Sequence, residues 1–240
     1  MRVGVYIDGF NLFYGGRALC GRGTAGWRWL DLRALTLASI GLRWQPVTML
    51  RIVYCTAKIG GERDAQSRLD QEAYLKALER SGAVDVIEYG DLVRRYKQSR
   101  AAEPGRRRVP LILGPETARG VEHPALLAVG DELRVGHEHI EEKGSDVNVA
   151  SHLLHDVLGG HVDAAVVVTN DSDLALPLRL ARDVVPVGTV NPRGNHTAGA
   201  LRGASGDGVG GHWWSRLGAS DFTEHQLPAS VPPVSRPNGW

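Results

Sequence analysis

Short runs of β-branched and other apolar residues alternate along the chain with longer stretches in which apolar residues recur at helical spacing. This alternation predicts an α/β fold with a mostly parallel sheet. The predicted strands cover residues 3–7, 50–55, 84–89, 164–168 and 184–190. Because residues 164–168 are apolar at every position, we expect that strand at the centre of the sheet, covered on both faces. Pro186 places the last strand nearer an edge, since proline cannot donate to the ladder.

Helical spacing predicts helices over residues 66–80, from Ser145 to residue 158 and from Ser172 to residue 180, with the two serines as N-caps. In the second of these helices the residues expected to face inward are Val147, Ala150, Leu153, Leu154, Val157 and Leu158. Two stretches, 94–130 and 191–212, are rich in Arg, Pro or Gly and are predicted as loops or insertions. We therefore expect one domain over residues 1–227, with a basic insertion near 94–130, and an extended tail over residues 228–240.

Composition narrows the class of protein. The 240 residues carry 28 basic and 27 acidic side chains, and 42% are hydrophobic, which suits a folded chain with a sizeable core. No apolar run approaches the roughly 20 residues that a transmembrane helix needs, so we expect no membrane partner. Cys20 and Cys55 are too few for a disulfide framework or a thiolate zinc site, which favours a cytoplasmic setting. Whether the chain forms a homo-oligomer stays open.

Carboxylates follow two of the predicted strands. Asp8 ends the first strand, Asp171 and Asp173 follow strand 164–168, and Asp146 lies in the first turn of the helix that leads into that strand. The ligand crevice of an open parallel sheet lies outside the carboxyl ends of its strands, so we expect these acids to converge there. Several carboxylates in one crevice repel one another unless a cation lies between them. Hard oxygen ligands suit Mg²⁺ or Mn²⁺, which is the cofactor that we predict.

Each of these acids also has a simpler explanation. Asp146 and Asp173 suit the first turn of a helix because of its dipole, and Asp171 is a common turn former. Other chemistries fit less well, because Phe10 stands where a haloacid-dehalogenase phosphatase has its second aspartate. The turn after the first strand lacks a glycine-rich dinucleotide motif, and neither a Walker loop nor a Gly-x-Ser-x-Gly elbow occurs. Hydride transfer and ATP hydrolysis are therefore disfavoured.

Three acidic blocks, at residues 6–11, 141–147 and 168–174, read YIDGFN, EEKGSDV and VTNDSDL. In this order they resemble the NYN family of PIN-like nucleases. The similarity extends to residues 53–57, 71–78, 190–193 and 236–240, and so to nearly the whole chain. The resemblance implies a three-layer α/β/α sandwich with a central parallel sheet, and hydrolysis of RNA phosphodiesters at a metal-binding crevice. It implies a role in catalysis for Asn11, which would orient water or phosphate, and for the metal ligands Asp8, Asp146, Asp171 and Asp173.

Charge is unevenly distributed. Residues 94–119 hold eight basic and two acidic side chains, whereas the rest of the chain holds 20 basic and 25 acidic ones. Such a segment could bind phosphates, although a solvated surface insertion explains it equally well. The nucleic-acid-binding residues that we predict are Arg94, Arg95, Lys97, Arg106, Arg107, Arg108 and Lys143. Because no element for reading a duplex groove is evident, the predicted partner is single-stranded RNA.

Five of the nine histidines fall between residues 137 and 161. His137 and His139 share one face of a strand, and His152 and His155 are helix neighbours at positions i and i+3. Zinc could use such a cluster, but the spacing matches no zinc motif. We therefore expect His152 and His155 at the margin of an exposed helix face.

Three functions follow, in order of preference. The first is a divalent-metal-dependent ribonuclease in which a metal-bound water attacks the phosphate in line. The second is a non-catalytic RNA-binding or regulatory module on the same fold. The third is a small-molecule phosphate or redox enzyme on that fold, which the missing phosphatase and dinucleotide motifs disfavour.

Overall fold

The computed structural model describes residues 1–41, 43–59, 65–104, 110–112, 114, 126–194 and 196–240. Two compact units make up the chain. Unit 1 comprises Met1–Asp91 and Lys143–Trp240, and unit 2 comprises Leu92–Glu142. Within the described ranges, no helix has the length and apolar character needed to cross a lipid bilayer.

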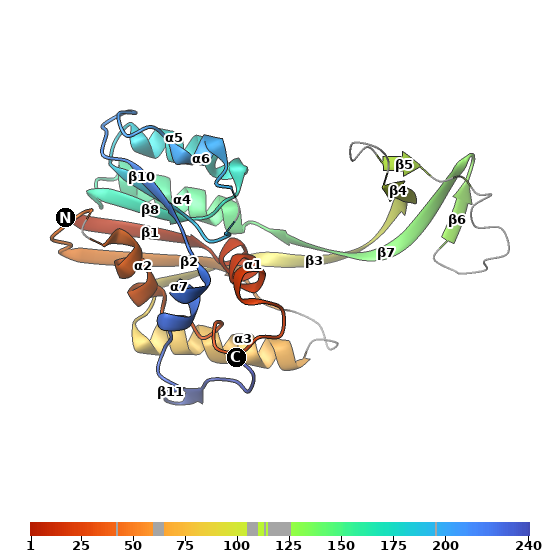
Figure 1. Ribbon diagram of the computed structural model, residues 1–240, viewed down its shortest axis with the longest axis horizontal. Helices are drawn as coiled ribbons and strands as arrows, with labels where there is room; N and C mark the ends of the chain where they lie inside the picture. Colours follow the sequence, from red (N-terminus) through yellow and green to blue (C-terminus); the bar gives the residue numbers. More distant parts are fainter. Residues whose placement is uncertain (42, 60–64, 105–109, 113, 115–125, 195) are drawn as a thin grey trace. The chain divides into compact units, whose positions relative to one another are not determined.

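Unit 1 is built on a parallel sheet with helices on both faces (Figure 1). Its strands stand in the order β10-β9-β8-β1-β2-β3, and each neighbouring pair among these six is parallel. Their bounds are β1 Arg2–Asp8, β2 Met49–Ala57, β3 Val86–Arg100, β8 Ala164–Val168, β9 Val187–Asn191 and β10 Trp213–Arg216. The predicted α/β class with a mostly parallel sheet is confirmed, and β8 is fully buried beside β1.

Side chains of β1 alternate between two apolar clusters because successive residues of a strand point to opposite faces. Val3, Val5 and Ile7 belong to the cluster beneath the first group of helices, and Tyr6 belongs to the cluster on the other face. The first group is α1 (Gly9–Cys20), α2 (Leu32–Ile40), α3 (Ala65–Ser81) and α7 (Ala219–Glu224). The second is α4 (Ser145–Leu158), α5 (Ala175–Arg182) and α6 (Gly199–Arg202), with the short 3₁₀ helix η4 (Ser172–Leu174) before α5.

The predicted helix starts need correction. Gly144, in the left-handed region with φ +95°, precedes α4, and Ser145 is its buried first residue rather than its cap. The cap before η4 is Asp171, whose carboxylate accepts the Asp173 N–H, rather than Ser172. In both cases the serine is the first residue of the helix, and the residue before it is the N-cap.

The inward face of α4 also differs from the prediction. Val149, Leu153 and Val157 are buried, whereas Val147 and Leu158 are each 66% exposed. The helix carries more apolar residues than its buried stripe needs, so apolarity alone did not fix its rotation about its axis.

Pro186 lies one residue before β9, which is second from the edge of the sheet, between β8 and the edge strand β10, so the predicted position near an edge is confirmed. The proline carbonyl accepts the Ala165 N–H, so it contributes to the ladder as an acceptor.

Unit 2 contains strands where the sequence indicated loops. The second half of β3 pairs onward to β7 (Glu132–Lys143), which runs antiparallel to β6 (Leu126–Val129). A second antiparallel pair joins β4 (Ala102–Pro104) to β5 (Pro110–Ile112). Most described side chains of this half of β3 are exposed. Strands without a buried face lack the alternation by which a strand is recognised in sequence.

The proline-rich tail packs against unit 1 and forms the two-stranded pair β11 (Ser230–Val231) and β12 (Val234–Ser235). The Trp29 indole N–H donates to the Pro228 carbonyl at 2.8 Å, and the ring of Trp240 lies 6.3 Å from that of Trp29. The tail therefore contributes to the aromatic part of the core.

Candidate functional site

Asp8 and Asn11 form one compact hydrogen-bonded turn at the carboxyl end of β1. Asp8 is 2% exposed and caps α1: one carboxylate oxygen accepts the Asn11 backbone N–H at 2.9 Å, and the other accepts the Asn11 side-chain amide at 2.6 Å. Aspartate is a favoured N-cap because its carboxylate satisfies the first free amides of a helix. The predicted pairing of Asp8 with Asn11 on one turn is present.

The end of β8 connects directly to this turn. Thr169, fully buried, donates its hydroxyl to Asp8 at 3.0 Å and accepts the Asp171 N–H at 3.1 Å. The Asn170 N–H donates to the Asn11 side-chain oxygen at 3.4 Å. The two strand ends therefore meet at one edge of the sheet, which is the position called the crevice below, as expected for neighbouring parallel strands. Sequence reasoning missed Thr169, although a hydroxyl residue directly after a wholly apolar strand was a usable signal.

The charge of Asp8 is costly in this setting. Burial raises the pKa of Asp8 above its usual value, the hydrogen bonds from Asn11 and Thr169 lower it, and the nearby carboxylate of Asp146 raises it further. Asp146 lies in the first turn of α4, so the start of this helix faces the same crevice.

The predicted metal ligands are only partly gathered. Asp146 lies near Asp8, whereas the Asp171 carboxylate caps η4 and only its backbone N–H joins the turn through Thr169; Asp173 is exposed in η4. Among the residues that the structure describes, these four acids do not bring three ligand atoms within 4.8 Å of one another. The Mg²⁺ or Mn²⁺ assignment stays a prediction.

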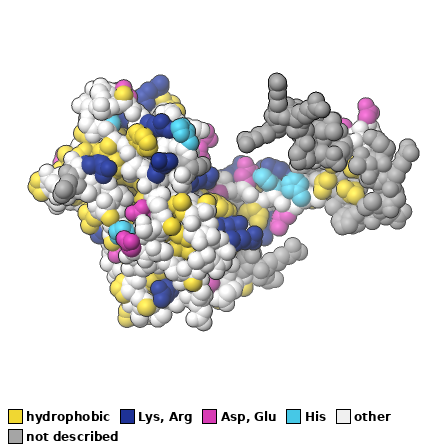
Figure 2. All heavy atoms as spheres, viewed as in Figure 1, with side chains coloured by type: hydrophobic (Ala, Val, Ile, Leu, Met, Phe, Trp, Pro, Cys, Tyr) yellow, Lys and Arg dark blue, Asp and Glu magenta, His cyan; other side chains and the backbone are white. Residues whose placement is uncertain are grey.

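The predicted nucleic-acid-binding residues are divided between the units. Lys143, the last residue of β7, belongs to unit 1. Arg94, Arg95 and Lys97 lie on β3 within unit 2, where Arg94 pairs with Glu138 at 3.4 Å. The remaining three, Arg106, Arg107 and Arg108, lie outside the described residues. On the face of unit 1 in Figure 2, basic side chains are interspersed with apolar and acidic ones and form no single patch.

A groove of about 620 Å³ lies between α5 and α6. Three arginines, Arg179, Arg182 and Arg202, line it together with Asp207. Burial lowers the pKa of Arg182, which donates to the Leu201 carbonyl at 2.5 Å and is thereby fixed in place. Asn170 contacts the residue before α6, because its side-chain oxygen accepts the Ala198 N–H at 2.9 Å.

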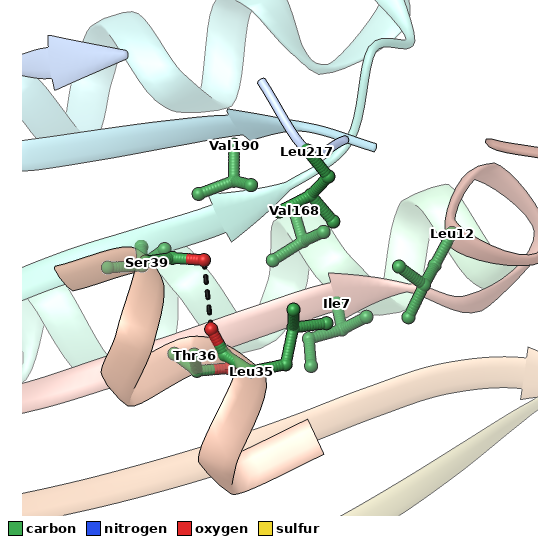
Figure 3. A pocket seen from close by; sticks show the side chains of 9 residues that line it. Ile7, Leu12, Leu35, Thr36, Ser39, Val168, Val190 and Leu217 are labelled. Atoms are coloured by element: carbon green, nitrogen blue, oxygen red, sulfur yellow. Dashed lines mark hydrogen bonds between the residues drawn. The ribbon is translucent and has the colours of Figure 1, made fainter. Parts of the chain in front are cut away.

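A second cavity, of about 10 Å³, lies in the core under the same strand ends (Figure 3). It is lined mostly by apolar side chains, including Ile7, Leu12, Val168 and Leu217. A space of this size and polarity holds no ligand and at most one poorly bonded water. This cavity is therefore not a candidate binding site.

Comparisons with known proteins give one informative relative. No family model matches the chain. The chain is 32% identical to 6-hydroxy-3-succinoylpyridine 3-monooxygenase HspA of Pseudomonas putida (strain DSM 28022 / S16), and the match covers all of this chain and 75% of that protein. A solved structure of a Vibrio parahaemolyticus RIMD 2210633 protein of unknown function aligns over 92% of this chain and 94% of that one, at 10% identity and a TM-score of 0.47. A fold likeness at that level carries no functional argument.

The prediction of a ribonuclease, and with it the hydrolase and nuclease classes, is wrong, because the relative that matches the whole chain is named as a monooxygenase. The acidic residues of the crevice led to this wrong prediction, because carboxylates at the ends of parallel strands are compatible with several chemistries. An enzyme is the part of the prediction that the relative supports, and a redox enzyme was the third of our alternatives. By the extent and identity of this match, the chain belongs to the same family as the HspA monooxygenase.

Proposed function

We propose that this chain is a monooxygenase whose substrate is a hydroxylated N-heteroaromatic acid. The observation that carries the proposal is the similarity over the full chain to a relative whose name specifies such a substrate, 6-hydroxy-3-succinoylpyridine. A monooxygenase places one atom of O₂ in its substrate and reduces the other to water with two electrons from a donor. The chain must therefore bind an acidic aromatic ring where it meets O₂ and reducing equivalents.

The crevice is the proposed position of the ring. Asp8 carries three hydrogen bonds from neutral donors, and a carboxylate has about four acceptor positions, so one remains for a substrate proton or a cation. Its raised pKa favours a carboxyl group that takes up a proton, such as that of a ring hydroxyl. Removal of that proton makes the ring richer in electrons, which assists attack by oxygen.

A divalent cation remains part of the proposal. Asp8 and Asp146 repel each other, and Mg²⁺ or Mn²⁺ between them would relieve this repulsion. Bound there, such an ion would supply positive charge for an ionised substrate oxygen. We also propose that unit 1 has the PIN-like sandwich fold, because that fold places its acids at this sheet edge.

A flavin or nicotinamide dinucleotide does not fit the turn after β1. Folds that bind these cofactors there seat a pyrophosphate on the N-terminus of the first helix. Here the Asp8 carboxylate already caps that helix and would repel a pyrophosphate. We therefore assign no step through a flavin to these residues.

The arginine groove is the proposed position of the substrate's acidic side chain. Arg179 is exposed on α5, and Arg202 stacks over the ring of Trp214 at 4.9 Å. Guanidinium groups bind carboxylates with paired hydrogen bonds. Asn170 contacts both Asn11 and the residue before α6, and on this connection we assign the ring of the ligand to Asp8 and its carboxylate to Arg179.

The test is oxygen consumption by the purified full chain. The assay contains 6-hydroxy-3-succinoylpyridine and reduced nicotinamide, with and without added flavin and Mn²⁺. We expect substrate-dependent O₂ uptake with an equal loss of reduced nicotinamide. Arg179→Ala should raise KM at least tenfold for this acid while leaving kcat within twofold, and Arg236→Ala, in the tail, is its control. Absence of uptake under every one of these conditions would refute the proposed function.

A further inference from the structure

Three metal-ligating side chains meet at the end of α4, away from the crevice. They are His155, Asp156 and His161, and one ligand atom from each lies within 4.8 Å of the others. In the described part of the chain this is the group of His, Cys, Asp and Glu side chains that meets this criterion. Asp146, at the crevice, precedes His155 by nine residues of helix, or about 14 Å along its axis. The cluster is therefore a separate place in the fold.

The chain after α4 is shaped to return His161 to the helix. Gly160 adopts φ +67°, a left-handed conformation that ends the helix, and the His161 N–H donates to the Asp156 carbonyl at 2.9 Å. A Cβ on Gly159 would lie 2.8 Å from the imidazole Cε1 of His161. The two glycines thus allow the imidazole to lie over the helix end, beside Asp156.

Asp156 is held as a metal-binding carboxylate is usually held, by partners behind it. Its side chain is 4% exposed, and one oxygen accepts the Tyr6 hydroxyl at 2.9 Å and the Arg51 guanidinium at 2.5 Å. The other oxygen lies 3.5 Å from Nδ1 of His161. The partners use one oxygen and leave the other directed at the histidines.

The spacing agrees with a shared ion. Two ligands about 2.0 to 2.1 Å from a tetrahedral Zn²⁺ are about 3.3 Å apart, close to the separation of Asp156 and His161. His155 is exposed, and its ring centre lies 5.1 Å from that of His161, so a side-chain rotation is enough to bring it into the set. His152, the helix neighbour of His155 at position i−3, is not part of this cluster, and its ring nitrogen contacts Glu88 at 3.0 Å.

We propose that His155, Asp156 and His161 bind a divalent first-row transition metal, with water completing its coordination. Two imidazoles and one carboxylate are a ligand set that suits both Zn²⁺ and Fe²⁺, whereas Mg²⁺ prefers oxygen ligands. Arg51 already balances the charge of Asp156, so the affinity is moderate and depends on the histidines. This inference does not depend on the proposed monooxygenase activity.

The experiment is calorimetric titration of the full chain with Zn²⁺ and, under anaerobic conditions, with Fe²⁺, both in excess Mg²⁺ so that the other proposed cation site, between Asp8 and Asp146, is already filled. We expect one ion per chain, with affinity reduced at least tenfold in His155→Ala and in His161→Ala. His152→Ala is the matched control, because it removes a histidine of the same helix outside the cluster. Asp171→Asn should also leave this affinity unchanged, which separates the cluster from the crevice.

A second variant tests the geometry without removing a ligand. Gly159→Ala should weaken metal binding at least fivefold, since its methyl group displaces the His161 ring. Circular dichroism would verify that each variant is folded. Failure of both Zn²⁺ and Fe²⁺ to bind, or binding that survives in the double variant of His155 and His161, would overturn the proposal.

Discussion

Asp8 and Asp156 are almost equally buried, at 2% and 3% exposed, but their surroundings differ in charge. Asp156 has a guanidinium and a tyrosine hydroxyl on one oxygen, and burial, together with the Asp156 carboxylate, raises the pKa of Tyr6. Asp8 has neutral donors and a second acid, Asp146, nearby. A buried charge is tolerated when it is paired and is costly when it is not. We therefore expect Asp156 to stabilise the fold, whereas the unpaired charge of Asp8 is one that a bound cation or proton would neutralise.

The largest expected effect is the loss of Asp156. Asp156→Ala leaves Arg51 and the Tyr6 hydroxyl without their partner and should lower the free energy of unfolding by about 3 kcal/mol. Urea denaturation followed by circular dichroism measures this change. A loss below about 1 kcal/mol would show that Arg51, whose side chain is 28% exposed, is satisfied by water instead.

The second effect concerns function rather than stability. Asp8→Asn should lower kcat at least tenfold, or about 1.4 kcal/mol of barrier, and should weaken Mn²⁺ binding. The variant should remain folded, because asparagine is also a good N-cap. Oxygen uptake and manganese paramagnetic resonance measure the two quantities. Unaltered turnover in a folded Asp8→Asn variant would remove Asp8 from the proposed site.

The third effect is a pH dependence of stability. The pKa of Asp8 is raised in the folded chain by burial, so the folded state holds its proton more tightly than the unfolded state does. Its contribution is fully present below the ordinary pKa of 3.8 and is lost as the pH rises through the folded value. The stability of the wild type relative to Asp8→Asn should therefore fall as the pH rises above about 4. Unfolding curves at several pH values would show this, and a rising difference would contradict it.

The smallest effect belongs to an exposed acid, Asp163. Arg2 hydrogen-bonds to it and holds its pKa at about 2, so its contribution is present above pH 3.8 and is lost as the pH falls toward 2. This slope is opposite in sign to that of Asp8. Because solvent and salt screen the pair, Asp163→Asn should leave the thermal midpoint at neutral pH within error. A clear loss of stability would mean that an exposed, paired acid such as Asp163 can stabilise the fold as a buried one does.

The sequence predicted best those elements whose burial is visible in the pattern of apolar residues. β8 is apolar at all five positions because both of its faces are covered, and it stands beside β1 as expected. Convergence of Asp8 and Asp171 followed from that adjacency, since parallel strands end at one edge. The strands of unit 2 were missed because both of their faces are exposed, so apolar and polar residues do not alternate along them.

The chemistry was less accessible than the fold. Residue types at the crevice indicated oxygen ligands but did not distinguish hydrolysis from oxygenation. His161 was hidden for a different reason: its contact with Asp156 depends on the turn at Gly159 and Gly160, and no helical spacing describes a residue beyond the helix end. Such contacts depend on backbone geometry, which residue spacing within one element does not encode.

Gly15 and Gly16 determine how closely α1 packs against its neighbours. A methyl group on Gly15 would collide with the carbonyl of Pro192, and one on Gly16 would lie 2.6 Å from the ring of Phe222. Both lie about one helical turn or little more from Asn11, so α1 can pack this closely against Pro192 and α7 only because these side chains are missing. The packing of α1 thus fixes the position of Asn11 relative to the strand ends. Changes in the interior of unit 1 could therefore shift Asn11 without altering any residue of its hydrogen-bonded turn.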